Sequence, residues 1–170
     1  MAFTPFTFEK CLYDRGEYPY THKGVLDVHP IGVEDVLTTA DEGYVVGEAV
    51  TITKTTGAVT KCAKGAKPDY IMAEAITAAG NATAHTLDAY RILPGMVWRV
   101  SVNFSSSAIA IVKDTGLEID QTNGSYVTDV KSSTVETVTT YGCAKVVDVL
   151  DANTDKTDGD EILVTFEDLN

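Results

Sequence analysis

The chain has few of the residues from which compact chemical sites are built. Its 170 residues include three cysteines and three histidines. Cys11, Cys62 and Cys143 are odd in number and far apart, which is typical of reduced thiols in a cytosol and not of a secreted disulfide framework. No stretch approaches the roughly 20 apolar residues of a membrane span, and the first residues lack the pattern of a signal peptide. We therefore expect a protein that is made in a cytoplasm and binds no membrane.

Basic residues are scarce as well. Thirteen lysines and arginines stand against 25 acidic residues, which leaves a net charge of −12. This balance argues against binding to nucleic acid through bulk charge. The imbalance is concentrated in residues 106–170, which carry four lysines and 13 acidic residues, whereas residues 1–105 carry nine basic and 12 acidic residues.

Motifs of catalysis and metal binding are absent from the sequence. It contains no Gly-x-Ser-x-Gly elbow and no P-loop, and its cysteines and histidines have no zinc-site spacing. Residues 151–161 begin like a calcium loop, but Lys156 and Ile162 occupy the sixth and twelfth positions, where that loop needs Gly and Glu. We expect no enzyme activity, no metal and no cofactor.

Strand-forming residues are abundant, since threonine and valine make up roughly a quarter of the chain. Residues 96–104 alternate apolar and polar, which predicts a strand with one buried face, one wet face and Trp98 as its core anchor. Residues 49–54 and 58–63 predict a hairpin that turns at Gly57, and residues 144–150 and 161–167 predict a second hairpin with a long loop. The fold class expected is mostly β, a small antiparallel barrel or sandwich.

The first 30 residues differ from the rest because aromatic residues and prolines follow one another there without a regular period. This composition predicts an extended N-terminal arm (1–30) before a β-rich body (31–170), which is either one barrel or two lobes divided near 105–115. An aromatic arm has to bury its rings, either as an edge of its own core, on a sister subunit or on a larger partner. The candidate contact residues in the arm are Phe3, Phe6, Phe8, Tyr13, Tyr18 and Tyr20.

Four lysines form a locally basic segment, because no acidic residue occurs between positions 49 and 68. They are Lys54, Lys61, Lys64 and Lys67. Such lysines can solvate an exposed sheet edge and block edge-to-edge pairing. Alternatively, they form a docking contact with an acidic surface of a partner.

Three segments of the middle of the chain resemble the small β-domains of tailed-bacteriophage capsid decoration (cement) proteins. They are GEAVTIT (47–53), PDYIMAEA (68–75) and AYRILPGMVW (89–98). The end of the chain, GCAKVVDV (142–149) with GDEILVTF (159–166), is similar to the closing strands of such virion proteins.

The resemblance implies a β-tulip-like body and a non-enzymatic role on the outside of a mature phage head. It implies the major capsid protein as partner, a homo-oligomer with a trimer favoured, and a location on the capsid surface of the virion. Two alternatives stay open. One is a tail-tube or head-completion subunit, and the other is a ligand- or carbohydrate-binding β-domain.

Overall fold

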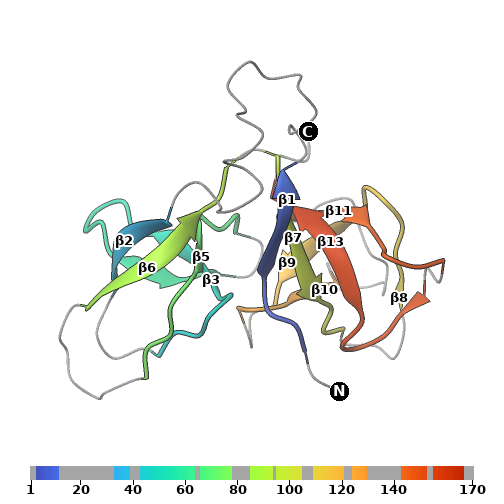
Figure 1. Ribbon diagram of the computed structural model, residues 1–170, viewed down its shortest axis with the longest axis horizontal. Helices are drawn as coiled ribbons and strands as arrows, with labels where there is room; N and C mark the ends of the chain where they lie inside the picture. The colour runs from blue at the N-terminus through green and yellow to red at the C-terminus, as the bar shows by residue number, and fades with distance from the viewer. Residues whose placement is uncertain are drawn as a thin grey trace.

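The computed structural model describes residues 3–11, 33–38, 43–63, 66–77, 85–93, 95–104, 109–120, 124–129, 143–152 and 155–166. In these residues the chain forms thirteen strands and no helix (Figure 1). The prediction of a mostly β fold built from antiparallel strands is confirmed. No helix of the described part is long and apolar enough to cross a membrane.

Five strands pair in a ring on one side of the molecule, in the order β2-β4-β3-β5-β6. All neighbours are antiparallel except β2 and β4, which close the ring through the single parallel pair Thr38 and Val59. The expected hairpin is β3 with β4, and Gly57 turns it with φ 70°, a conformation that glycine adopts without strain. The bounds are β2 Val33–Thr38, β3 Ala49–Ile52, β4 Val59–Lys61, β5 Tyr70–Met72 and β6 His85–Arg91.

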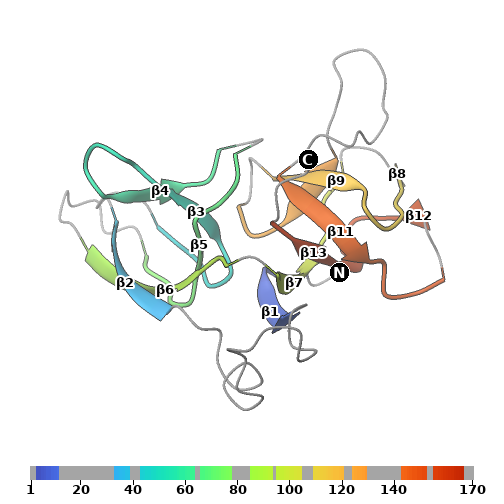
Figure 2. The ribbon, with the colours of Figure 1, turned by 90° about the horizontal axis from the view of Figure 1, so that it is seen from above.

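A six-stranded sheet lies beside the ring, in the order β1-β7-β13-β11-β9-β10, and all its neighbours are antiparallel. The expected C-terminal hairpin is β11 with β13. A two-stranded ribbon, β8 with β12, lies at the end of the sheet away from the ring (Figure 2). The bounds are β1 Thr7–Cys11, β7 Met96–Ser101, β8 Ile109–Ala110, β9 Gly116–Ile119, β10 Val127–Asp129, β11 Ala144–Asp148, β12 Asp155–Lys156 and β13 Glu161–Thr165.

Alternation along the ring strands gives the ring two apolar faces. In β5, Tyr70 and Met72 belong to the core inside the ring, whereas Ile71 belongs to the larger core shared with the six-stranded sheet. In β3, Val50 belongs to the core inside the ring and Ala49 to the shared core. Successive side chains of a strand point to opposite faces. One face of these ring strands therefore packs inside the ring, and the other face packs on the sheet.

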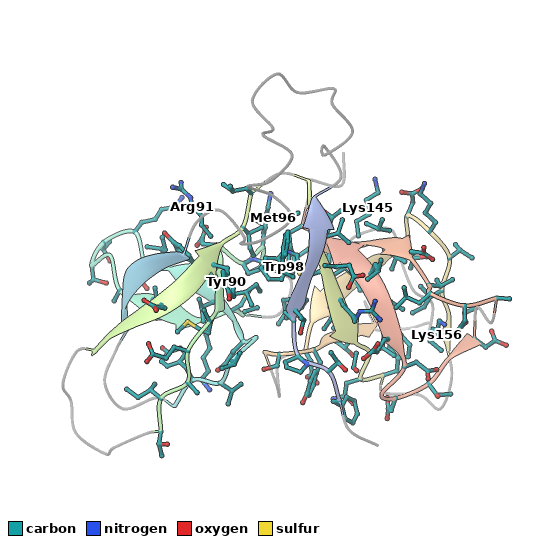
Figure 3. The ribbon with its side chains drawn as sticks, in the orientation of Figure 1. Tyr90, Arg91, Met96, Trp98, Lys145 and Lys156 are labelled. Carbon is teal, nitrogen blue, oxygen red and sulfur yellow. The ribbon has the colours of Figure 1, made fainter. Side chains whose placement is uncertain are left out.

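The core between the two units is centred on Trp98 of β7, which is fully buried. Tyr90 of the ring approaches it with 6.2 Å between ring centroids, and Figure 3 shows these two side chains between the ring and the sheet. The chain passes from the ring to the six-stranded sheet between β6 and β7.

The prediction of a wet face on β7 is wrong for most of the strand. Val97 and Ser101 are fully buried, although the alternation placed them on the solvent side. β7 lies between β1 and β13 in the sheet, and at its Ser101 end the N-terminal segment lies against it. Ser101 donates its backbone N–H to the carbonyl of Thr4, and its hydroxyl accepts the N–H of Thr4. Arg99 alone of the expected polar positions in β7 is partly exposed.

Candidate protein-binding surfaces

The described part of the predicted arm, residues 3–11, lies on its own chain. β1 pairs with β7 as an edge strand of the six-stranded sheet. Phe6 is 3% exposed and packs on Phe166 with 5.4 Å between centroids, and Phe8 packs edge-on against Trp98 at 5.8 Å. Three locations were expected for the arm: the edge of its own core, a sister subunit or a larger partner. Residues 3–11 lie at the edge of their own core. Tyr13, Tyr18 and Tyr20 lie outside the described residues.

Polar contacts fix the same segment across three strands. The guanidinium of Arg99 in β7 donates two hydrogen bonds to Glu9 of β1, at 3.0 and 3.1 Å, and one to Glu161 of β13, at 3.1 Å. The hydroxyl of Thr4 also donates to Glu161. The hydrogen bonds from Thr4 and then Arg99 lower the pKa of Glu161 below its ordinary value. The carboxylate is therefore held in its charged form between two donors.

A close backbone approach joins the N-terminal segment to the ring. Gly47 has φ 78°, and a Cβ atom built on it would lie 2.6 Å from the Cβ of Pro5 and 2.8 Å from the carbonyl oxygen of Phe6. Only glycine fits a left-handed position that another chain segment crosses so closely. Nearby, Ala49 of β3 donates its N–H to the carbonyl of Gly124, at 2.8 Å. Three distant segments, 3–6, 44–49 and 124–126, therefore meet at one place.

Apolar side chains reach the surface where these three segments meet. Val45 and Val46 are each 51% exposed in the turn before Gly47. The rings of Phe3 and Tyr126, both partly exposed, lie 4.9 Å apart. We call this surface, with Pro5 beside Gly47, the junction face. Exposed apolar side chains that are close together make this surface a candidate for protein contact.

The lysine candidates are placed unequally. Lys54 is exposed in the turn of the β3–β4 hairpin, and Lys67 is exposed beyond it. Lys61 lies 3.1 Å from the carboxylate of the buried Glu48, and its ammonium lies 5.6 Å above the ring of Tyr44. Lys61 therefore stabilises the ring itself, while its side chain stays 48% exposed. Lys64 lies outside the described residues.

The acidic turn at residues 151–160 uses its carboxylates within the fold. Asp158 accepts the N–H of Phe104 at 2.6 Å, and Asp160 accepts the N–H of Thr157 at 2.8 Å. Lys156, with its side chain 1% exposed, places its ammonium 2.7 Å from Asp151. In the described part of the chain, no group of three or more His, Cys, Asp or Glu residues could hold a metal ion. Lys156, which stands where the calcium-loop pattern needs glycine, thus supplies the positive charge beside Asp151.

Two cysteines are buried in the core shared by the ring and the sheet. Burial, and after it the charges of Cys143 and Asp69, raise the pKa of the Cys62 thiol to about 12. Burial likewise raises the pKa of Cys143 to about 11. The thiolate is the reactive form of cysteine, so both side chains are chemically quiet at neutral pH.

We expect Cys62 and Cys143 to resist iodoacetamide in the folded protein at pH 8 and to react fully in urea. Mass mapping of each cysteine in a Cys11→Ser background measures this. Because the folded state keeps protons that the unfolded state releases above about 8.5, the free energy of unfolding should also fall as pH rises from there toward the folded pKa values. Rapid labelling of either thiol in the folded protein would contradict the expectation.

Of the side chains in the junction face, Phe3 was among the predicted contact residues, whereas Val45, Val46 and Tyr126 were not. The members of this face come from three segments that are far apart in the chain, and no local pattern joins them. The one available signal was the Val45-Val46 pair directly before a glycine, which is a turn position with no buried face to occupy. Sequence reasoning chose aromatic residues as contacts, and two of these, Phe6 and Phe8, pack on the chain's own core.

No family model matches the sequence, and no curated protein matches it. Among solved structures, the fold is similar to that described as the crystal structure of the head fiber gp8.5 N base in bacteriophage phi29. The TM-score is 0.45 with 11% sequence identity, and the match covers 79% of this chain and 94% of that chain. A likeness at this level carries no inference about function.

Proposed function

We propose that the chain is a structural protein of a tailed-phage head that binds the outer surface of the capsid and stabilises the mature shell. The sequence resemblance to capsid decoration proteins supports this proposal. The resembling segments between residues 47 and 98 form strands of the ring and the strand β7 of the sheet. The partner would be the major capsid protein, and the place of action would be the capsid surface of the virion.

The observation that carries the proposal is the junction face. Val45 and Val46 are exposed beside the start of the chain, at the seam of two units that the N-terminal segment holds together. We expect a contact surface built on such a seam to be rigid, because Phe6 and the Arg99 hydrogen bonds hold the segment behind it. Rigid apolar anchors lose little entropy when they bind, which favours a lasting contact with a shell subunit.

The mechanism would be mass action on the shell. A protein that binds only the matured lattice stabilises it by RT ln(1 + [L]/Kd), which is about 4 kcal/mol per site at a thousandfold excess over Kd. Repeated over many sites, this free energy opposes the outward pressure of packaged DNA. The lysines of the β3–β4 hairpin and the three arm tyrosines remain further candidates for contact with a capsid or with another subunit.

Gradient sedimentation of particles from producing cells tests the proposal, with mass spectrometry of this chain relative to the major shell protein. The unaltered chain should move with filled heads. The double variant Val45→Asp/Val46→Asp should remain free, whereas Val45→Leu/Val46→Leu, which keeps the surface apolar, should still bind. Near-ultraviolet circular dichroism of both variants checks that the fold is intact.

Other outcomes would replace the proposal. Migration of the unaltered chain with tails would select the tail-tube subunit, and recovery only as free protein would reject both virion roles and favour a ligand-binding domain. If the Val45→Asp/Val46→Asp variant still binds heads, the contact lies elsewhere on the chain. The triple variant Tyr13→Ala/Tyr18→Ala/Tyr20→Ala then separates the remainder of the arm from the body, because it leaves β1 in place.

A further inference from the structure

The N-terminal segment, residues 3–11, is attached to the body differently from the other strands of its sheet. Among the described strands, β1 pairs with β7 alone, and the register of that pairing shifts between Phe8 and Lys10. Figures 1 and 2 show β1 at the centre of the molecule, where the ring and the six-stranded sheet meet. β7 also pairs with β13, over four residue pairs. The remaining strand pairs of the sheet are therefore made without β1.

Partly exposed polar contacts hold the two ends of this segment. At its start, the backbone of Thr4 makes two hydrogen bonds with Ser101, at 2.8 and 2.9 Å, and its hydroxyl donates to Glu161. At its far end, Glu9 accepts two hydrogen bonds from Arg99, whose side chain is 34% exposed. Because water reaches charged pairs of this kind, each holds the segment less firmly than a buried contact would.

The junction face is complete only while this segment is in place. Phe3 and Pro5 come from the segment itself, and the ring of Phe3 lies 4.9 Å from that of Tyr126. Pro5 lies across Gly47, where an added Cβ atom would be 2.6 Å from the Cβ of Pro5. Release of the segment therefore removes two side chains of the face and uncovers Gly47.

The other half of the face is held by the body alone. The N–H of Val45 donates to the carboxylate of Glu48 at 3.0 Å, and the N–H of Glu48 donates to the carbonyl of Val45 at 3.1 Å. Tyr126 is held between β9 and β10, since its carbonyl accepts the N–H of Asp120 at 2.9 Å. The face thus combines a half that belongs to the body with a half that the segment brings.

We propose that residues 3–11 act as a strap that regulates the junction face, so that closing completes the face and opening removes it while the ring and the sheet stay folded. A terminal edge strand is expected to open in this way, because elements held by few contacts open at a lower free energy than the whole fold. A partner that binds only the complete face favours the closed strap, and closing of the strap favours that partner equally. The inference rests on the proposed function only for the identity of the partner.

Hydrogen exchange at two neighbouring amides of the purified full chain, measured by NMR, supplies the first test. Ser101 donates its N–H to Thr4 of the strap, whereas Val102 donates its N–H to Asp160 of the body, both at 2.9 Å. After correction for intrinsic rates, Ser101 should exchange about tenfold or more faster than Val102. Equal exchange would overturn the proposal, because the strap would then open only when the whole protein unfolds.

The variant Thr4→Val loosens the strap without changing a side chain of the junction face. It removes the hydroxyl that donates to Glu161 and keeps the volume of the side chain. The exchange rate of Ser101 should rise by about fivefold or more, while that of Val102 stays unchanged. Equal acceleration of both amides would contradict a local opening.

Thr7→Val is the matched control, because it makes the same chemical change in the same segment. The hydroxyl of Thr7 donates to the carbonyl of Pro5, at 3.0 Å, and so makes its contact within the strap. Its loss should leave the exchange rates of Ser101 and Val102 as they are in the unaltered chain. Acceleration of Ser101 as large as that in Thr4→Val would mean that the contact with Glu161 does not hold the strap.

Coupling of the face to the strap is tested from the body side with Tyr126→Ala. This variant removes the ring that contacts Phe3 and leaves the strap itself unaltered. Exchange at Ser101 should rise by about threefold or more, with Val102 unchanged, since an aromatic pair that holds the closed strap is lost. No effect on Ser101, or an equal effect on both amides, would overturn the coupling.

Protection by phage heads tests the partner separately. Chymotrypsin cuts after Phe6 and Phe8 when the strap is open, and mass spectrometry assigns these cuts, so their rate measures opening. Chain bound to filled heads should be cut there about tenfold or more slowly than free chain. Equal rates would overturn the regulation of the face by the strap. Failure of the unaltered chain to bind heads would instead reject the proposed function, and the exchange rates of the purified chain would still decide whether strap and face are coupled.

Discussion

Replacing Phe6 with alanine is expected to lower the free energy of unfolding by about 3–5 kcal/mol. The ring is 3% exposed, packs on Phe166 and belongs to the core shared by the ring of strands and the sheet. Its removal leaves a cavity beneath the N-terminal segment, and the surrounding strands are held by their own pairing and cannot close it. Urea unfolding monitored by the fluorescence of Trp98, the one tryptophan of the chain, measures the change.

Phe3→Ala is the matched control, because Phe3 begins the same segment but is only partly buried. It should lower the free energy of unfolding by less than half as much as Phe6→Ala does. A loss of under about 1 kcal/mol for Phe6→Ala would mean that the segment is a dispensable covering and not part of the core.

The second large change in the free energy of unfolding is expected from substitutions at the buried ion pair of Lys156. Asp151→Asn should destabilise the fold by about 3 kcal/mol or more, because it leaves a positive charge 1% exposed without the carboxylate 2.7 Å away. Lys156→Met should cost much less, since it removes the buried charge and leaves Asp151, whose side chain is 61% exposed, solvated by water. The two variants differ in which partner stays behind.

Urea unfolding of both variants and of the double variant measures this asymmetry, and the double variant should resemble Lys156→Met. Equal losses for the two single variants would mean that the pair acts through a symmetric attraction. Addition of calcium to the unaltered chain serves as a control and should leave its unfolding midpoint unchanged, since Lys156 already supplies a cation within the turn.

Local patterns predicted the strands well, and longer-range relations escaped them. The β3–β4 hairpin followed from two runs of β-branched residues around Gly57, and the pairing of β11 with β13 followed from two apolar runs around a polar loop. The wet face assigned to β7 was wrong because alternation shows which residues share a face and not what covers that face. Val97 is fully buried, so a face that the local pattern assigns to solvent can still be covered by the rest of the fold.

The candidate surfaces were predictable only in part. The lysines of the hairpin were visible because they are close in sequence, but the pairing of Lys61 with Glu48 was not. The burial of Lys156 could not be read from an acidic stretch, where a lysine normally solvates a turn. The junction face depends on the meeting of Pro5 with Gly47, a tertiary contact that leaves no trace in either segment beyond the glycine itself.

The attachment of the first residues also constrains how the protein reaches its native state. Thr4 binds Ser101 and Glu161, partners that are 97 and 157 residues away in the chain. During synthesis the N-terminal segment emerges first, and its binding site is complete only after β13 has been made. Contacts of such sequence separation form slowly, because a long loop has to close before they gain anything. We therefore expect Phe3, Phe6 and Phe8 to stay uncovered for much of the synthesis of the chain, and docking of this segment to be a late step of folding.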